Sequence, residues 1–289
     1  MTIANEFIEQ NNGWKSQSET YHRLRGLIAA QDSKMSDFVT TINSDPSLVT
    51  KVVDFANSPL FNPVRSIQTL EQAISHLGVM QLKDVLLCNL TINAFTYLPD
   101  NIIKLPIFWE NSLLCAIIAR ILAQKCNLQN SGQLFTLGLL HDIGHLAMYS
   151  VIPDTTLEAF NFSNQRDKPV NIVEREKLGF DYAQVGSELM QNWSFPLSYQ
   201  IITEHHPEPK DTPEFYLETA IIHMARCLTF QTEKTSKNKQ FQIKPIASSV
   251  TNLSIDSLTD LKEQAQHYVT EIAHCLELPL PDSNISTLK

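Results

Sequence analysis

The sequence predicts an all-α protein, and three features of its 289 residues carry the prediction. Apolar residues recur mostly at positions i, i+3 and i+4, which is the spacing of one face of an α-helix. Segments with alternating β-branched residues, which would indicate strands, are few. The chain also holds only 8 glycines, a residue that weakens helices wherever it falls inside them.

The segment up to about residue 97 predicts five helices. Asp45 and Pro46 form a strong helix start, because the aspartate can cap the helix and proline fits its first position. Residues 57–59 (Asn-Ser-Pro) end that helix. Ser66 is placed to cap the following helix and Gly78 to end it. The predicted helices cover residues 17–31, 33–43, 46–57, 67–78 and 79–97.

The remainder of the chain predicts seven more helices. Two segments between them are expected to be non-helical: residues 150–169, which are polar and irregular, and residues 232–244, which are polar and rich in lysine. The predicted helices cover residues 108–126, 133–149, 172–178, 182–192, 197–205, 215–230 and 256–276.

Prolines near residues 99 and 106 divide the predicted helices into two halves. Residues 1–99 form a smaller N-terminal helical half, and residues 104–230 hold every histidine with a suspected chemical role. Residues 231–289 add a polar loop and a C-terminal amphipathic helix. Because short helices need mutual burial, we expect the halves to share an interface.

Composition excludes several classes of protein. Hydrophobic residues make up 43% and charged residues 18%, as in ordinary globular chains. We expect a cytoplasmic protein, because there is no signal peptide pattern, no run of about 18 apolar residues, and no CxxC among five scattered cysteines. A net charge of −9 disfavours nucleic acid as a partner.

One stretch carries most of the chemical signal: Gly138 to Gly144, with the sequence GLLHDIG. Adjacent residues of a helix point about 100° apart, so His141 and Asp142 cannot hold an ion alone. A divalent ion would need neighbouring helices, and the His205-His206 pair at a helix end could supply ligands. Alternatively, His141 and Asp142 hydrogen-bond each other and the backbone. Gly144 allows another segment to approach closely.

The GLLHDIG stretch resembles the signature of the HD superfamily of metal-dependent phosphohydrolases. The chain from about residue 18 to 230 resembles one branch, the HDOD domain, a helical output domain of bacterial signalling proteins. This resemblance implies an HD-superfamily-like multi-helix domain preceded by a smaller N-terminal helical subdomain. The matching stretches are FANSPLF (55–61), SIQTLEQAISHLG (66–78), FWENSLLCA (108–116), LGFDYAQVGSELMQNW (178–193) and EHHPEP (204–209).

The same resemblance shows where ligands of a working HD site are replaced. Asn111 stands where the first His belongs, Tyr182 where metal-binding members carry a His, and Arg226 at the position of the last Asp. His141, Asp142, His205 and His206 are retained. His145 could line the same pocket or face solvent after the motif, and His223 is expected to be a core histidine.

These replacements favour a regulatory module over an enzyme. The ligand set keeps one carboxylate, and an inward Arg226 would repel a metal ion. We therefore expect a non-catalytic signalling module that binds a protein partner or a small ligand, with Asn111, His145 and Tyr182 lining its pocket. The alternative is a metal-dependent phosphohydrolase acting on phosphoesters or nucleotides, in which His141, Asp142, His205 and His206 hold a single divalent transition metal. A nucleotide sensor ranks last, because no glycine-rich phosphate loop is present.

Overall fold

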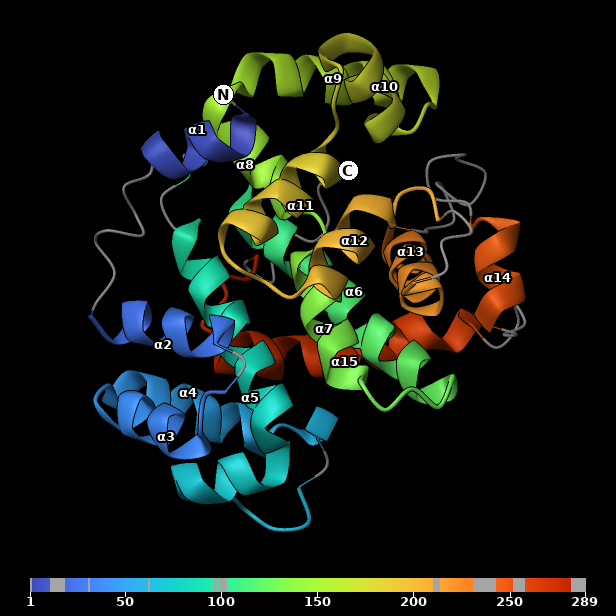
Figure 1. Cartoon of the computed structure of the whole chain (residues 1–289). Helices are drawn as coiled ribbons and strands as arrows, with labels where there is room; N and C mark the ends of the chain where they lie inside the picture. Colours follow the sequence, from blue (N-terminus) through green and yellow to red (C-terminus); the bar gives the residue numbers. More distant parts are fainter. Residues whose placement is uncertain are drawn as a thin grey trace.

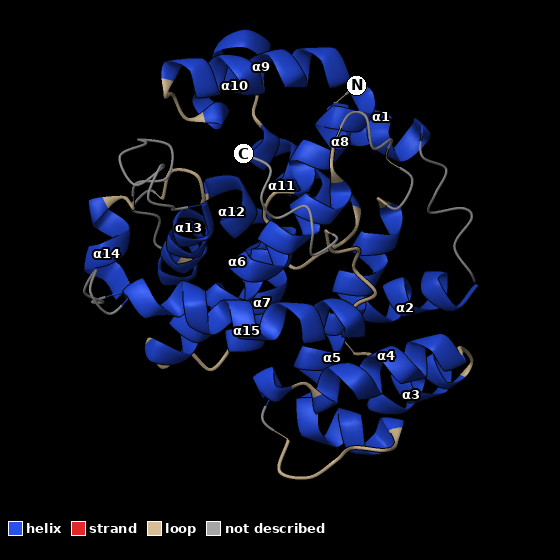
Figure 2. Cartoon of the chain, turned by 180° about the vertical axis from the view of Figure 1, so that it is seen from behind, coloured by secondary structure: helices blue, strands red, loops and turns tan. Residues whose placement is uncertain are grey.

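The computed structural model describes residues 2–10, 19–30, 32–61, 63–95, 98, 103–209, 214–230, 243–251 and 258–281. Every regular element in these ranges is helical, which confirms the all-α prediction (Figures 1 and 2). The predicted polar loop at 232–244 lies outside the described residues, except for its last two positions.

Most of the connections that lie wholly within these ranges are short. In chain order they are α1 (Ile3–Gln10), α2 (Glu19–Ala29), α3 (Met35–Asn43), α4 (Pro46–Asn57), α5 (Leu70–Ala94), α6 (Leu105–Lys125), α7 (Ser131–Leu140), α8 (Ile143–Val151), α9 (Pro153–Arg166), α10 (Val170–Leu178), α11 (Tyr182–Asn192), α12 (Leu197–His205), α13 (Tyr216–Phe230), α14 (Pro245–Thr251) and α15 (Thr259–Cys275). A short 3-10 turn, η2 (Pro59–Phe61), follows α4.

Helices α2 to α5 enclose a small core of their own at one end of the molecule (Figure 1). The Asp45 side chain caps α4 by accepting from the backbone N–H groups of Ser47 and Leu48, as predicted. The predicted cap of α5 was wrong: Thr69, rather than Ser66, accepts from the backbone N–H of Gln72. Ser66 instead precedes Ile67, whose backbone is hydrogen-bonded in both directions to the Asn57 side chain.

Helix α5 changes direction at Gly78, where the sequence predicts one helix to end and another to begin. Gly78 has φ 77° and ψ 167°, a left-handed conformation that side-chain-bearing residues rarely adopt. The second segment of α5 then reaches the other half of the molecule and packs against α7. The Tyr199 hydroxyl of α12 donates to the carboxyl of Asp84 on this segment. Burial raises the pKa of Asp84 to about 7, although the Tyr199 hydrogen bond opposes the shift.

The larger core is organised around α6, which contacts α7, α13 and α15. By length and composition α6 is the one described helix that could cross a membrane, but 72% of its most apolar 18-residue stretch is buried inside the molecule. That burial is typical of the core helix of a soluble protein, so the apolar composition of α6 is weak support for a membrane span. Helix α6 is apolar on all faces because other helices pack on several sides of it.

Two helices at the chain ends connect distant parts of the sequence. Helix α1, which the sequence did not predict, packs mainly on α8 and α11. Its Phe7 stacks on Phe95 with ring centroids 4.8 Å apart. Helix α15 contacts both α4 and α6 (Figure 1). The proposed division at residues 99 and 104 stays a prediction, with α1 packed outside the N-terminal core.

Two predicted segments were wrong. The single helix predicted over residues 133–149 is two helices, because the chain turns at His141 and Asp142 between α7 and α8. The segment 150–169, predicted to be irregular, contains α9. Pro153 begins this helix, and small buried residues (Thr156, Ala159, Ser163) give it a narrow packing face that its polar composition conceals.

Candidate functional site

The His141–Asp142 pair lies buried at the turn between α7 and α8. The His141 Nδ1–H donates to the carbonyl oxygen of Gly138 at 2.7 Å, which fixes the ring and turns Nε2 toward Asp142. That Nε2 lies 3.2 Å from Oδ2 of Asp142. The backbone carbonyl of Asp142 accepts from the N–H of His145 and so begins α8. Backbone contacts within residues 138–145 therefore position the pair, in addition to the contacts that other helices make.

Gly144 brings α11 against this turn, as the sequence predicts for a position without a side chain. A Cβ atom at Gly144 would lie 1.9 Å from the carbonyl oxygen of Tyr182 and 2.7 Å from the backbone nitrogen of Gly186. The backbones of α8 and α11 thus touch directly. This contact places Tyr182 beside His141 and Asp142.

His206 completes a cluster with the His-Asp pair. Its Nδ1–H donates to the carbonyl oxygen of Thr203 at 2.7 Å, and its Nε2 lies 3.6 Å from Oδ1 of Asp142. One ligand atom from each of His141, Asp142 and His206 falls within 4.8 Å of the others. The Tyr182 hydroxyl lies 3.2 Å from Nε2 of His206 and occupies its free nitrogen.

His205 does not join this cluster, in contrast to the four-residue set expected from the sequence. Among the described histidines, cysteines and carboxylates, only His141, Asp142 and His206 form such a group. His205 instead lines a surface hollow of about 130 Å³ with Arg175 and Glu208. Neighbours on a helix end point in different directions, so one imidazole turns inward and the other outward.

Arg226 of α13 points into the cluster. Its Nε lies 3.5 Å from Oδ1 of Asp142, and its guanidinium lies over the rings of Tyr182 and Phe230 at 5.7 and 5.5 Å. The side chain is only 13% exposed. The Arg226 guanidinium therefore supplies positive charge beside the single carboxylate of the cluster.

His145 and Tyr182 form the wall of the site beside α10. Their rings stack with centroids 3.8 Å apart, so His145 lines the cluster rather than facing solvent. His145 Nδ1 lies 3.6 Å from Oε1 of Glu174, and the backbone N–H of Tyr182 donates to Oε2 of the same residue at 3.0 Å. Burial raises the pKa of Glu174 to about 8. Glu174 had no motif signal in the sequence.

Helix α6 reaches the site through Cys115 rather than Asn111. Cys115 is buried, and its thiol interacts with His141. Asn111 lies one helical turn earlier and is half-buried. The hydrogen bonds and ion pairs of the described residues include none between Asn111 and the cluster. Residues i and i+4 lie on the same face of a helix, so the position of Cys115 four residues after Asn111 could have identified it from the sequence.

His223 is a core histidine, as expected. Its Nδ1–H donates to the carbonyl oxygen of His206 at 2.9 Å, and its Nε2 accepts from the backbone N–H of Lys244 at 3.1 Å. Burial lowers its pKa to about 3, so it is neutral at pH 7. It holds the turn after α12 against α13.

The charges of the cluster compensate one another. Burial opposes a charge on His141, but the adjacent Asp142 carboxylate outweighs burial and raises the pKa of His141 to about 10. Burial likewise opposes the charge on Asp142, yet His141 and Arg226 hold the pKa of that carboxyl well below its usual range. Burial lowers the pKa of His206 to about 4. At neutral pH the cluster is a buried carboxylate between two cations.

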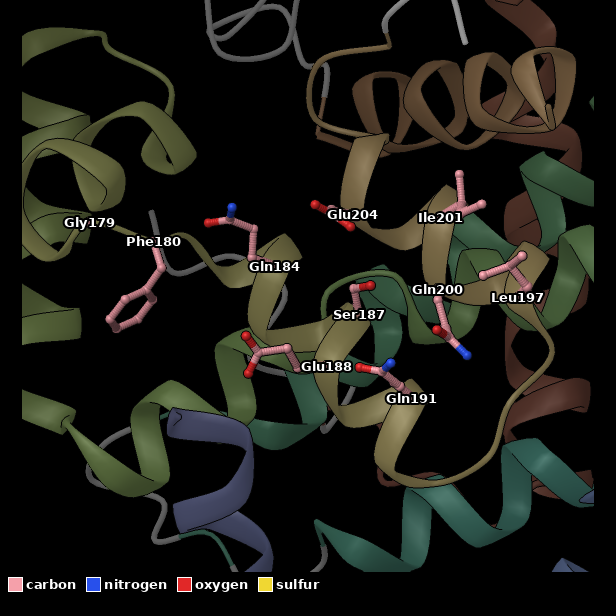
Figure 3. A pocket seen from close by; sticks show the side chains of 10 residues that line it. All are labelled: Gly179, Phe180, Gln184, Ser187, Glu188, Gln191, Leu197, Gln200, Ile201 and Glu204. Carbon is pink, nitrogen blue, oxygen red and sulfur yellow. The ribbon is translucent and has the colours of Figure 1, made fainter. Parts of the chain in front are cut away.

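A polar groove opens on the surface between α11 and α12 (Figure 3). Its volume is about 370 Å³, and it is lined by three glutamine amides and two carboxylates, but by no lysine or arginine. Glu188 and Glu204 supply the carboxylates. The amides are those of Gln184, Gln191 and Gln200. A groove of this composition favours groups that carry positive charge and hydrogen-bond donors.

Comparison with known proteins identifies the family. The HDOD domain matches residues 15–209 of the chain. The chain belongs to the HDOD domain family. Within that match lie the His141–Asp142 turn, Tyr182, His206 and the α11–α12 groove, whereas Arg226 lies beyond it.

Solved structures share the fold of this HDOD chain. A protein from Shewanella amazonensis SB2B, named "putative phosphohydrolase", is 22% identical with a TM-score of 0.69, over 93% of this chain and 97% of that one. An HDOD domain protein of unknown function from Geobacter sulfurreducens is 18% identical with a TM-score of 0.66, over 95% of this chain and 96% of that one. Identities at this level show the fold alone.

A curated relative extends beyond this chain. An uncharacterized protein from Treponema pallidum (strain Nichols) is 24% identical over 195 residues, which make up 67% of this chain. The chain spans 37% of the length of that relative.

The HD superfamily implies a metal, and the donor set here fits one poorly. Three ligand atoms are close enough together, but a divalent ion needs anionic ligands to offset its loss of water. The single carboxylate already faces Arg226 and His141, and the Tyr182 hydroxyl occupies the free nitrogen of His206. An added dication would meet the Arg226 charge at short range in a buried site, which is strongly unfavourable.

Proposed function

We propose that this HDOD chain is a non-catalytic signalling module, which acts by binding a protein segment or a small ligand rather than by hydrolysing phosphoesters. The observation that carries the proposal is the position of Arg226, whose Nε lies 3.5 Å from the only carboxylate of the buried cluster. Where an HD enzyme would need a metal ion, this chain has its own cation. The cluster then ties α7, α12 and α13 together.

Metal content and hydrolysis test this proposal directly. Purified protein is incubated with Mn²⁺, Ni²⁺ or Mg²⁺, dialysed, and assayed for bound metal and for release of p-nitrophenol from mono- and diester substrates. We expect no stoichiometric metal and no metal-dependent turnover. Turnover that depends on metal and disappears in His141→Ala would overturn the proposal and establish the alternative, a phosphohydrolase with His141 and Asp142 at its centre.

Arg226 offers a sharper version of the same test. Arg226→Asp removes the cation and adds a carboxylate, so we expect Ni²⁺ affinity to rise at least about tenfold, equivalent to about 1.4 kcal/mol. Arg226→Lys keeps the charge and serves as the matched control. Equal Ni²⁺ affinity in the wild type and Arg226→Asp would show that Arg226 does not block the site.

The α11–α12 groove is the surface we propose for a protein partner, specifically a segment that carries lysine or arginine. Glu188 and Glu204 supply its charge, and the glutamine amides can pair with peptide backbone groups. Fluorescent basic peptides should bind more weakly to Glu188→Lys/Glu204→Lys than to Glu71→Lys/Glu263→Lys, which changes the net charge equally at exposed sites elsewhere. Equal weakening by both pairs would reduce the effect to net charge and remove the groove from the proposal.

We also propose that the protein is cytoplasmic. All five cysteines are free, and four of them are buried. Free buried thiols suit a reducing compartment.

A further inference from the structure

A separate cavity of about 180 Å³ lies where α4, α5 and α6 meet the segment after α15. Its lining includes Lys51 of α4, Asn89 and Asn93 of α5, Trp109 of α6, and Glu277. None of these residues belongs to the His141–Asp142 cluster or to the polar groove. The cavity is therefore lined by residues from the N-terminal helices, from α6 and from the C-terminal segment.

Lys51 is a buried cation at the edge of this cavity. Its side chain is 10% exposed, and its Nζ lies 2.9 Å from Oε2 of Glu277. An ammonium with this little exposed surface is stabilised by an anion close by, because it has lost much of its water. Among the described residues, Lys51 forms its ion pair with Glu277.

Glu277 is an unusual partner for a buried cation, because its own side chain is 64% exposed. Its backbone is fixed independently of its carboxylate: the N–H of Glu277 donates to the carbonyl oxygen of His274, and the N–H of Leu278 to that of Ala273. Its φ of 53° belongs to this helix-ending turn. The carboxylate can therefore leave Lys51 by side-chain rotation, with no change in the backbone.

The remaining walls of the cavity consist of apolar side chains and two asparagine amides. Trp109, Ile92 and Leu105 supply flat or branched apolar surface, and Asn89 and Asn93 supply polar groups beside it. Asn93 Nδ2 donates to the Tyr21 hydroxyl at 3.1 Å. A cavity of about 150 Å³ accepts a benzene ring, so this one has room for a ring or short chain with one acid group.

We propose that this cavity binds a small monocarboxylate with a short aromatic or aliphatic body. The carboxylate of the ligand replaces that of Glu277 on Lys51, and the body lies against Trp109 in the apolar part of the cavity. A carboxylate is the anion to expect, because the chain itself places one on Lys51. This site is independent of the proposed function of the His141–Asp142 cluster and of the groove.

Calorimetric titration and thermal unfolding test the proposal with defined probes. Benzoate, phenylacetate and hexanoate are the carboxylates; benzamide is the neutral isostere of benzoate, and inorganic phosphate is a different anion. We expect the carboxylates to bind and to raise the melting temperature, and benzamide and phosphate to do neither at up to about 10 mM.

Three variants identify the site. Glu277→Gln removes the competing carboxylate from an exposed position, so we expect benzoate affinity to rise about tenfold. Lys51→Met removes the cation and keeps the apolar stem, so binding should be lost. Glu71→Gln removes an exposed carboxylate elsewhere on α5 and should bind benzoate as the wild type does.

The outcomes separate clearly. Tighter benzoate binding by Glu277→Gln, with none by Lys51→Met, supports the site; far-ultraviolet circular dichroism checks that Lys51→Met is folded. The proposal is overturned if no carboxylate binds either the wild type or Glu277→Gln, or if benzamide binds as well as benzoate. Because Glu277→Gln alters an exposed side chain, the test does not depend on whether Lys51→Met folds.

Discussion

Two of the buried ions in the described part of the chain have counter-ions that differ in exposure. Asp142 faces Arg226, which is 13% exposed and packed over aromatic rings. Lys51 faces Glu277, which is 64% exposed and lies beside a cavity. In the first case the counter-ion is a fixed part of the core. In the second it can exchange with solvent or with another anion. The exposure of the counter-ion therefore distinguishes the two sites more than the burial of the ion does.

The largest expected effect is at the fixed pair. Asp142→Asn keeps the shape of the side chain but leaves His141 and Arg226 without an anion in a buried site. We expect the free energy of unfolding to fall by about 3–5 kcal/mol, measured by urea denaturation. A loss below about 1 kcal/mol would mean that the three charges are not coupled as the distances indicate.

The contact that builds the cluster is the next most sensitive feature. Gly144→Ala places a Cβ atom 1.9 Å from the carbonyl oxygen of Tyr182, so α8 and α11 must move apart. We expect a loss of about 2–4 kcal/mol in urea denaturation. The matched control is Gly26→Ala, where nothing lies within 4 Å and where higher helix propensity should stabilise α2 by up to about 1 kcal/mol. Equal effects of the two changes would contradict the close backbone contact.

Asp84 is a buried acid that differs from Asp142, because its partner is the Tyr199 hydroxyl rather than a cation. Burial raises its pKa from 3.8 to about 7, so the folded state holds the proton more tightly than the unfolded state does. This contribution to stability is complete below about pH 4 and is lost as pH rises through 7. We expect the free energy of unfolding of the wild type, relative to Asp84→Asn, to fall by about 2–4 kcal/mol between pH 4 and 8. Chemical denaturation of both proteins across that range measures it, and parallel curves would refute it.

The smallest expected effect is at the exposed counter-ion. Glu277→Gln removes the partner of Lys51, but that partner is mostly solvated. We expect stability to change by less than about 1 kcal/mol in urea denaturation, several-fold less than for Asp142→Asn. A loss as large as that of Asp142→Asn would show that the Glu277 carboxylate is not exchangeable, and the comparison between the two ions would fail.

Local sequence signals predicted most of the helices, because caps and apolar periodicity act over a few residues. The start of α4 at Asp45-Pro46 and the bounds of α11 at residues 182–192 are examples. The local signals failed at two places for different reasons. Helix α9 depends on tertiary packing of a narrow face of small residues. The break at His141–Asp142 accompanies a local contact that the helical periodicity does not reveal, in which the His141 ring donates to the Gly138 carbonyl.

The sequence by itself determined that the protein is helical. It also predicts that His141 and Asp142 are the chemical focus and that HD ligands are replaced at Asn111, Tyr182 and Arg226. Only the tertiary structure decided that His206 turns inward and His205 outward, that Arg226 faces Asp142, and that Cys115 and Glu174 line the site. It alone brought Lys51 to Glu277 across most of the chain. The physical reason is that periodicity and capping are short-range, whereas the pairing of buried charges is set by which helices meet in space.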